Sequence, residues 1–253
     1  MLRQPGAEVV VVDYGCPDGT ADHVAARHPS VRVVRTGPVE GFNASRARNL
    51  GAAAAAGETL IFVDADVVLA DGFLAYLAEN LKPDAFAKPR DPRTLDENSV
   101  QGTCVVHRNH FELVGGYDEV LVNYGGEDLE LYERLNTARV QRMYLPPSLF
   151  ARVIPHGPED RERFLDARAD TGFMVGKVYR IAKDMMIRLN GTFDVDIATR
   201  RQLYDEVTRL VNNMNRMREK NLTLEVKFSE QSDAGLHKHW NFQRSIRVTV
   251  EPR

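Results

Sequence analysis

Residues 60–66 read Leu-Ile-Phe-Val-Asp-Ala-Asp, four apolar residues followed by two carboxylates that are separated by one residue. This pattern is typical of a short buried strand that ends in a charged turn. Side chains at i and i+2 share one face of a strand, so Asp64 and Asp66 can converge on one cation. Hard divalent ions such as Mg²⁺ and Mn²⁺ prefer oxygen ligands of this kind. A surface turn with two aspartates gives the same pattern, so the neighbouring segments must decide between the two interpretations.

Composition sets broad limits on the protein. The 253 residues carry a net charge of −3 and are 43% hydrophobic, which suits one large or two small globular domains without a bulk charge for binding nucleic acid. No apolar run approaches the eighteen or so residues of a membrane span, and the N-terminus does not resemble a signal peptide. Cys16 and Cys104 lie far apart and form neither a metal motif nor a disulfide framework, which favours a reducing, cytoplasmic location.

The first third of the chain alternates between strand and helix signals. Strands are expected at 8–13, 31–34 and 60–63, and helices at 20–28 and from a cap at Asn43 or Ser45 to a C-cap at Gly57. This order predicts the α/β class: an open, mostly parallel, Rossmann-like sheet with helices on both faces. Ligands bind at the carboxyl ends of the strands in such sheets. Asp13 and the Asp64/Asp66 pair are both predicted there.

The next segment contains two glycine pairs and a candidate catalytic helix. A helix is expected at 71–81, a polar loop at 88–101, a strand at 103–107 and a short helix at 109–114. The glycine pair before Glu127 predicts a helix start, with Leu131 and Leu135 on its apolar side. Asp128 lies on that same side and should face inward, where the helix dipole favours a carboxylate. An acidic first turn that only stabilises the helix remains the alternative.

The character of the sequence changes after residue 160. We therefore predict a catalytic domain at 1–160 and a C-terminal extension at 161–253. Helices are expected at 173–189 and 199–220, and strands at 223–228 and 245–250. In the first of these helices Val178, Ile181, Met185 and Leu189 share one side, as in a core or a partner-packing face.

Five motifs together resemble a known family. Val11-Val-Asp-x-Gly-x-x-Asp-Gly-Thr20, Ala47-Arg-Asn-Leu-Gly51 and Val63-Asp-Ala-Asp66 resemble the nucleotide-sugar half of a GT-A fold glycosyltransferase of the family-two type. Gly115-Gly-Tyr-Asp-Glu119 and Gly125-Gly-Glu-Asp-Leu-Glu-Leu131 resemble the acceptor half of the β4-galactosyltransferases, bacterial chondroitin polymerases and polypeptide N-acetylgalactosaminyltransferases. Phe42-Asn-Ala-Ser-Arg-Ala-Arg-Asn49 is similar to a segment of the same group. The resemblance covers roughly residues 8–160.

The resemblance implies a role for each matching residue. Asp13 would contact the uracil of a UDP-sugar, Arg48, Asn49 and Gly126 would lie near the donor, and Asp64 would contact its ribose or sugar. Asp66 and His156 would ligate Mn²⁺ or Mg²⁺. Asp128 would be the catalytic base, and Glu127 would hold the acceptor or the donor sugar.

The chemistry that the resemblance implies is physically coherent. A metal neutralises the charge that develops on a leaving diphosphate, and an acceptor hydroxyl needs a carboxylate within hydrogen-bond reach. The acceptor is expected to be a carbohydrate, a peptide or a small molecule, and both inversion and retention at the sugar remain open. Homo-oligomer formation is also left open. The alternatives are an inactive relative that binds nucleotide-sugar or glycan, or acts as a scaffold, and a nucleotidyltransferase, for which no Gly-rich, lysine-bearing phosphate loop is visible.

One departure from the family pattern concerns the sheet itself. In this family a first strand and helix precede the strand that carries Asp13, and here only about seven residues do. A central slot with two unpaired edges should result. Three explanations are open: a misplaced start or truncation, a strand from a partner chain, or a permutation in which residues 245–250 fill the slot.

Overall fold

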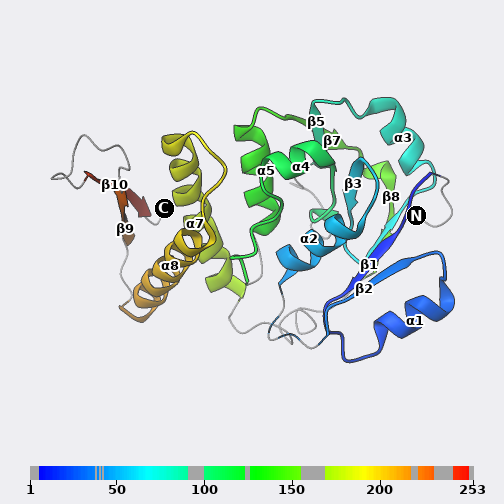
Figure 1. Ribbon diagram of the computed structural model, residues 1–253, viewed down its shortest axis with the longest axis horizontal. Helices are drawn as coiled ribbons and strands as arrows, with labels where there is room; N and C mark the ends of the chain where they lie inside the picture. The colour runs from blue at the N-terminus through cyan, green and yellow to red at the C-terminus, as the bar shows by residue number, and fades with distance from the viewer. Residues whose placement is uncertain are drawn as a thin grey trace. The chain divides into compact units, whose positions relative to one another are not determined.

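The computed structural model describes residues 6–37, 39, 41, 43–90, 100–122, 126–154, 169–217, 222–230 and 242–250. The chain divides into two compact units, Met1–Asp166 and Ala167–Arg253, so the division falls six residues after the predicted boundary at 160. Each unit has helices and strands of its own (Figure 1). Among the described residues, no helix has the length and apolar character that a membrane crossing requires.

The first unit begins with the predicted alternation of strand and helix. Its first five elements are β1 (Val10–Asp13), α1 (Thr20–Arg27), β2 (Arg32–Arg35), α2 (Ala44–Ala54) and β3 (Thr59–Phe62). β1 and β2 pair in parallel, from Val10 opposite Arg32 to Asp13 opposite Arg35. Both α1 and α2 contact these two strands. The order of elements expected from the sequence is therefore confirmed.

The remainder of the first unit completes a second, larger sheet. Its elements are β4 (Val67–Leu69), α3 (Phe73–Asn80), β5 (Ala85–Pro89), β6 (Cys104–His107), α4 (Arg108–Leu113), α5 (Glu127–Thr137), β7 (Gln141–Leu145), the 3-10 turn η2 (Pro147–Leu149) and β8 (Phe150–Val153). Four strands form one sheet in the order β3-β6-β5-β7, and β4 pairs separately with β8. Lys88 and Pro89, expected in a loop, belong to β5, and residues 91–99 of that loop lie outside the described part.

The α/β class is confirmed, but strand pairing is more mixed than the mostly parallel sheet that we expected. β6 runs antiparallel to both of its neighbours, β3 and β5, whereas β5 and β7 are parallel. The chain between β5 and β6 contains no crossover helix among its described residues, and directly joined neighbours pair antiparallel. Helices α4 and α5 lie between β6 and β7 in sequence and allow the parallel return to β5.

A groove of about 850 Å³ lies between β1 and β3, where the empty slot was predicted. It is lined by residues of β1, α2, β3 and α3, and the α2 residues include Arg48. Within the described part of the chain, β1 pairs only with β2, and β3 pairs only with β6. The β1-β2 sheet and the four-stranded sheet are therefore not joined by a described strand.

The hypothesis that residues 245–250 fill this slot is wrong. They belong to β10 (Phe242–Val250), which pairs antiparallel with β9 (Leu222–Glu230) along its whole length, from Phe242 opposite Glu230 to Val250 opposite Leu222. The alternation of β-branched and polar residues suited a strand of either kind. The local partner is favoured because a hairpin costs less chain entropy to close than a pairing across the whole sequence.

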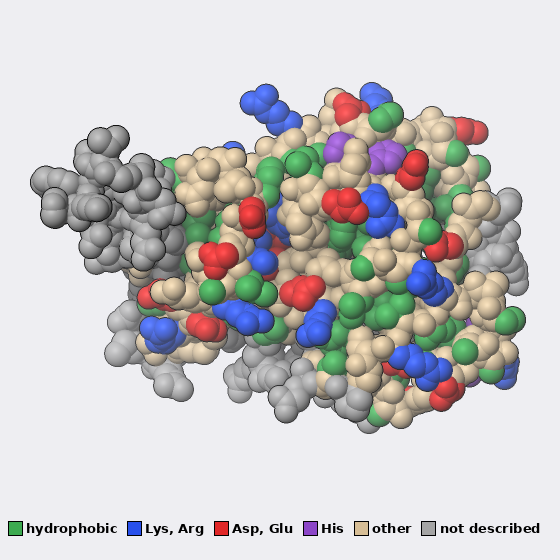
Figure 2. Space-filling view, viewed as in Figure 1, with side chains coloured by type: hydrophobic (Ala, Val, Ile, Leu, Met, Phe, Trp, Pro, Cys, Tyr) green, Lys and Arg blue, Asp and Glu red, His purple; other side chains and the backbone are tan. Residues whose placement is uncertain are grey.

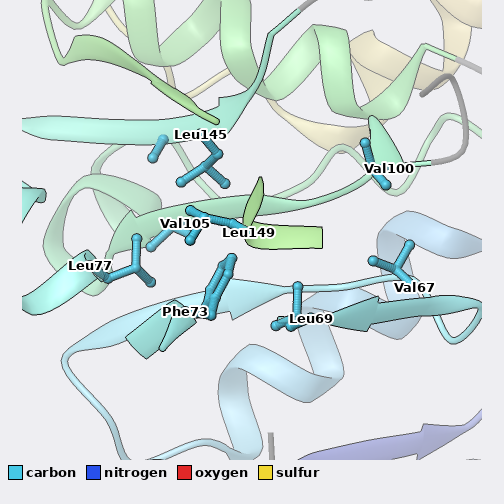
Figure 3. Close-up of a cluster of buried hydrophobic side chains, with 9 residues drawn as sticks. Val67, Leu69, Phe73, Leu77, Val100, Val105, Leu145 and Leu149 are labelled. Atoms are coloured by element: carbon cyan, nitrogen blue, oxygen red, sulfur yellow. The ribbon is translucent and has the colours of Figure 1, made fainter. Parts of the chain in front are cut away.

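A buried apolar cluster supports the segment that follows Asp66. Its members come from β4, α3, β5, β6, β7 and η2 and from Val100, and Figure 3 shows most of them as labelled sticks: Val67, Leu69, Phe73, Leu77, Ala87, Val100, Val105, Leu145 and Leu149. The side chains of Phe73 and Val105 are fully buried. Burying one side chain of this size contributes roughly 1.5–3 kcal/mol. The cluster therefore anchors β4 directly after the aspartate pair.

The second unit contains the predicted two helices and two strands. α7 (Ala169–Asn190) packs against α8 (Ile197–Met217), with the rings of Tyr179 and Tyr204 5.7 Å apart at the contact. Of the four residues predicted to share one apolar side of α7, only Val178 is buried, so the core interpretation of that side is wrong. Ile181, Met185 and Leu189 are 36–57% exposed, and the buried residues of α7 include Tyr179, Ala182 and Met186. The partner-packing interpretation stays a prediction.

Helix α2 ends earlier than the sequence suggested. Its C-cap is Ala55 in an extended conformation, not Gly57. The Glu8 carboxylate accepts hydrogen bonds from the backbone N–H groups of Ala56 and Gly57 just beyond this end. A side chain distant in sequence therefore satisfies these groups, and a glycine cap is not needed. At the other end, the Asn43 side chain accepts from the Arg46 N–H, as predicted for an N-cap.

An ion pair in the core fixes the orientation of α5. Glu130 and Arg134 are 2% and 4% exposed, and the Arg134 Nε lies 2.7 Å from the Glu130 Oε1. Arg134 also donates to the carbonyl oxygen of Val114, in the turn after α4. This pair ties the helix that carries Glu127 and Asp128 to the neighbouring glycine turn.

Replacing Glu130 by Ala should lower the free energy of unfolding by about 3–5 kcal/mol, because Arg134 would remain charged in the core without its carboxylate. Urea denaturation measures this loss. The matched control is Glu112→Ala, which removes an i,i+4 partner from Arg108 where the carboxylate is 65% exposed and should cost at most about 1 kcal/mol. Equal losses in the two variants would contradict a structural role for the buried pair.

Candidate active site

The guanidinium of Arg48 lies at the centre of the candidate site. Arg48 is on α2, and its Nη2 lies 2.9 Å from the Asp64 Oδ1, just after β3. Its Nη1 lies 3.0 Å from the Glu127 Oε1 and 3.1 Å from the Asp128 Oδ1, in the first turn of α5. Arg48 is 16% exposed. One cation therefore joins carboxylates from segments 16 and about 80 residues away in sequence.

The charges in this cluster do not balance, because three carboxylates face one guanidinium. Burial opposes the charged form of Arg48, but the carboxylates of Asp128, Asp64 and Glu127 outweigh it and raise the pKa of Arg48. Burial also raises the pKa of Asp128 to about 8; Arg48 opposes that rise, and the neighbouring acids Glu127 and Asp64 add to it. The raised pKa favours the protonated form of Asp128, which would relieve part of the excess negative charge.

The start of α5 follows the sequence prediction. Gly126 is the N-cap with φ 104°, a conformation that favours glycine over residues with a Cβ. Leu131 and Leu135 are fully buried, so they form the predicted apolar side of the helix. Asp128 lies near that side and faces Arg48, as its spacing indicated. The predicted donor contact of Gly126 stays a prediction.

Asn49 holds a backbone turn beside the cluster. Its Oδ1 accepts from the Tyr117 N–H at 2.8 Å, and its Nδ2 donates to the Tyr117 carbonyl oxygen and to the Glu119 carboxylate, both at 2.9 Å. A Cβ on Gly116 would meet the Asn49 Oδ1 at 2.8 Å, and Gly116 has φ 69°. Both facts explain why the motif carries glycine there. The amide of Asn49 thus has protein partners at both of its atoms, and its expected contact with the donor remains a prediction.

Tyr117 is a site residue that the sequence reasoning missed. Its ring lies under the Arg48 guanidinium at 5.1 Å and packs edge-on against Phe62 at 5.1 Å. Only 1% of Tyr117 is exposed, and burial raises the pKa of its hydroxyl well above the usual range. Its place in the Gly115-Gly-Tyr motif was the available signal. The aromatic face packs against the Arg48 guanidinium and restrains it.

Asp13 lies at the end of β1, as predicted, and shapes the turn that follows. One carboxylate oxygen accepts from the Cys16 N–H at 2.8 Å and the other from the Ala21 N–H at 2.9 Å. Asp13 thereby fixes the turn between β1 and α1. Whether it also contacts a nucleotide base stays a prediction.

Of the two predicted metal ligands, Asp66 belongs to the described part of the chain and His156 does not. The backbone oxygen of Asp66 accepts from the Ile154 N–H at 2.7 Å, where β4 pairs with β8. His156 follows Ile154 by two residues in sequence and lies outside the described residues. Within the described part, no cluster of three or more His, Cys, Asp or Glu side chains is arranged to hold a metal ion. The pairing nevertheless brings the chain past Asp66 just before His156.

Of the predicted residues, the structure brings together Arg48, Asp64, Glu127 and Asp128, with Asn49 bracing the adjoining turn. On the face that Figure 2 shows, Lys and Arg side chains are interspersed with Asp and Glu, and no large surface of one charge is visible.

Two family models match this chain. Residues 1–99 match the glycosyl transferase family 2 model, and residues 84–156 match the model described as the N-terminal domain of galactosyltransferase. Together they cover every motif on which the resemblance rested, and they confirm it. Residues 1–99 are therefore similar to family 2 glycosyl transferases, and residues 84–156 are similar to galactosyltransferases. No curated protein sequence matches the chain.

The solved structures that match this chain include a mannosyltransferase and a galactosyltransferase. The mannosyltransferase PcManGT from Pyrobaculum calidifontis, in complex with GDP-Man and Mn²⁺, is 17% identical with TM-score 0.49; the match covers 82% of this chain and 61% of that one. The catalytic domain of Drosophila beta1,4-galactosyltransferase 7 with xylobiose is 18% identical over 64% and 75%, with TM-score 0.46. GalNAc-T7 with UDP, GalNAc and Mn²⁺ is 15% identical over 84% and 50%, with TM-score 0.49. All three TM-scores are below 0.5, so the class rests on the family models.

Replacing Arg48 by Met should lower the free energy of unfolding by about 1–3 kcal/mol at pH 7, because three partly buried carboxylates would lose their shared cation. Met keeps most of the apolar stem, so the loss reports the charge. The control is Arg35→Met, which breaks an exposed pair with Asp22 and should cost at most about 1 kcal/mol. If Arg48→Met unfolds in urea like the wild type, the cluster does not stabilise the fold.

Proposed function

We propose that this protein transfers a sugar from a nucleotide-sugar donor, a UDP-sugar, to an acceptor hydroxyl with the help of a divalent metal ion. The observation that supports this most is the convergence of Arg48, Asp64, Glu127 and Asp128 from three separate motifs. Motif residues that served only local turns would have no reason to share one guanidinium.

Each residue has a role that suits its surroundings. Asp128 would accept the proton of the acceptor hydroxyl, because it is the most strongly perturbed carboxylate in the cluster and faces inward. Glu127 would hydrogen-bond the sugar or the acceptor. Arg48 lies between the donor side at Asp64 and the acceptor side at α5, and its charge would stabilise negative charge that develops between them.

The residues present are compatible with a metal ion such as Mn²⁺. Asp66 offers a hard oxygen ligand directly after the donor strand, and we propose His156 and oxygens of the donor diphosphate as further ligands. A bound metal would neutralise the charge on the leaving diphosphate. Asp64 is paired with Arg48, so we assign it to the donor and not to the metal.

A second candidate function is nucleotide-sugar or glycan binding without transfer. The observation that favours it is that Arg48 already engages all three carboxylates of the cluster, including the proposed base. A protein of this kind would bind UDP in the presence of Mn²⁺ but would not turn over a UDP-sugar.

The decisive measurement is Mn²⁺-dependent cleavage of a panel of UDP-, GDP- and dTDP-sugars, with UDP binding followed by calorimetry. Asp66→Ala should abolish the metal-dependent part of UDP binding, whereas Asp128→Asn should leave binding intact and reduce turnover by about 10²–10⁴-fold. Asp71→Asn, outside the cluster, serves as the control. Binding without turnover in the wild type would favour the second candidate, and no Mn²⁺-dependent binding would refute both.

Turnover should rise with pH, because Asp128 can accept a proton only when it is ionised. With burial raising its pKa to about 8, the rate should increase about tenfold per pH unit below that value and level off above it. The free energy of unfolding should change with pH in the opposite direction. A carboxyl whose pKa is raised in the folded state stabilises the fold most at low pH, and this contribution is lost as the pH rises through about 8. Asp128→Asn should remove both trends, in rate profiles and in urea denaturation at pH 5 and 9. A rate that is flat between pH 6 and 9 would exclude Asp128 as the base.

A further inference from the structure

The backbone of Gly102 lies against the Asp64 carboxylate. A Cβ built on Gly102 would lie 2.0 Å from the Asp64 Oδ2, 2.7 Å from its Cγ and 2.8 Å from its Oδ1. The three nearest atoms therefore all belong to one side chain. Gly102 is buried, and its φ is not in the left-handed region, so the backbone would accept other residues there. The closest obstacle to a side chain at this position is therefore the Asp64 carboxylate.

The turn that contains Gly102 is held from the far side. The Thr103 N–H donates to the Val100 carbonyl oxygen at 2.9 Å, which closes the turn. The Tyr132 hydroxyl, on α5, lies 3.1 Å from the Gln101 carbonyl oxygen, to which it donates. Tyr132 is 3% exposed and stacks on Phe86 with ring centroids 5.7 Å apart. The backbone at Gly102 therefore has little room to move away from Asp64.

Asp64 is the most mobile of the groups in this contact. Its side chain has two rotatable bonds and is 35% exposed, whereas the turn at 100–103 is packed against α5. A methyl group at position 102 would thus displace the carboxylate and not the backbone. The displaced carboxylate could no longer lie 2.9 Å from the Arg48 Nη2.

We propose that Gly102 is a positioning residue of the donor site. Because it has no side chain, its backbone packs directly against the Asp64 carboxylate and keeps it in contact with Arg48. This inference rests on the proposed function for its effect on the donor, but the contact itself does not depend on any activity. Gly102 would act only through Asp64 and would touch neither donor nor acceptor.

The test is a double-mutant cycle between the two positions, read by urea denaturation and by calorimetric titration with UDP and Mn²⁺. Gly102→Ala should weaken UDP binding about tenfold, the equivalent of one charge-assisted hydrogen bond, and should lower the urea midpoint. In the Asp64→Ala background, where the carboxylate is gone, Gly102→Ala should have no further effect on either quantity. In the Asp64→Asn background, where the volume is kept, its effect should persist.

Gly57→Ala is the matched control, because the nearest atoms to its Cβ are 3.6 Å away and its φ is also outside the left-handed region. It should bind UDP as the wild type does. Should Asp64→Ala fail to fold, Asp64→Ser provides a shortened side chain for the same cycle. A Gly102→Ala variant that matches Gly57→Ala, or one that is equally impaired with and without Asp64, would overturn the proposal.

The two proposals can fail separately. If the wild type binds no UDP with Mn²⁺, the proposed function is refuted, and the denaturation cycle still decides whether Gly102 constrains Asp64. If UDP binds and the cycle shows no coupling between positions 102 and 64, the function stands and the positioning role of Gly102 is refuted.

Discussion

The shared attraction of three carboxylates to the Arg48 guanidinium is the interaction on which the candidate site depends. Asp64, Glu127 and Asp128 would repel one another in a partly buried space, and a single cation makes their proximity tolerable. The position of Arg48 is itself restrained by the ring of Tyr117 and by the packing of α2 against β1 and β2. Burial raises the pKa of Asp128, and the neighbouring acids Glu127 and Asp64 add to that rise.

Glycine residues in two turns allow the backbone conformations and close contacts on which the Arg48 cluster depends. Gly126 adopts a positive φ at the start of α5, and Gly116 allows the Asn49 amide to approach the turn that carries Tyr117. Behind them, the buried Glu130–Arg134 pair ties α5 to the carbonyl oxygen of Val114. The residues with a role in the proposed reaction are thus held in place by residues that have only a structural role. Glu127 and Asp128 lie on α5 together with the structural pair Glu130 and Arg134.

Much of the fold was predictable because it depends on local periodicity. The β-branched run of β1, the cap at Asn43 and the apolar stripe of Leu131 and Leu135 all act over a few residues, and each was found where expected. The failures depend on how separate elements pair and contact one another. Glu8, distant in sequence, satisfies the backbone beyond α2 and removes the need for a cap at Gly57. β6 runs against its neighbours because of how the chain connects them, and β10 pairs with its hairpin partner β9, although its composition would suit a central strand equally well.

By itself, the sequence determined the class of protein and pointed to Arg48, Asp64, Glu127 and Asp128, since motif spacing is a local property of the chain and the family models match the same segments. Only the tertiary structure decided which of these residues contact one another and which bind the backbone. It placed Arg48 among three acids, gave Asn49 and Asp13 backbone partners, and brought Tyr117 and Gly102 against the cluster. Apart from the contact of Asp13 with Cys16, these contacts join residues between 8 and 80 positions apart. Their distances depend on packing between elements, which no periodicity in the sequence encodes.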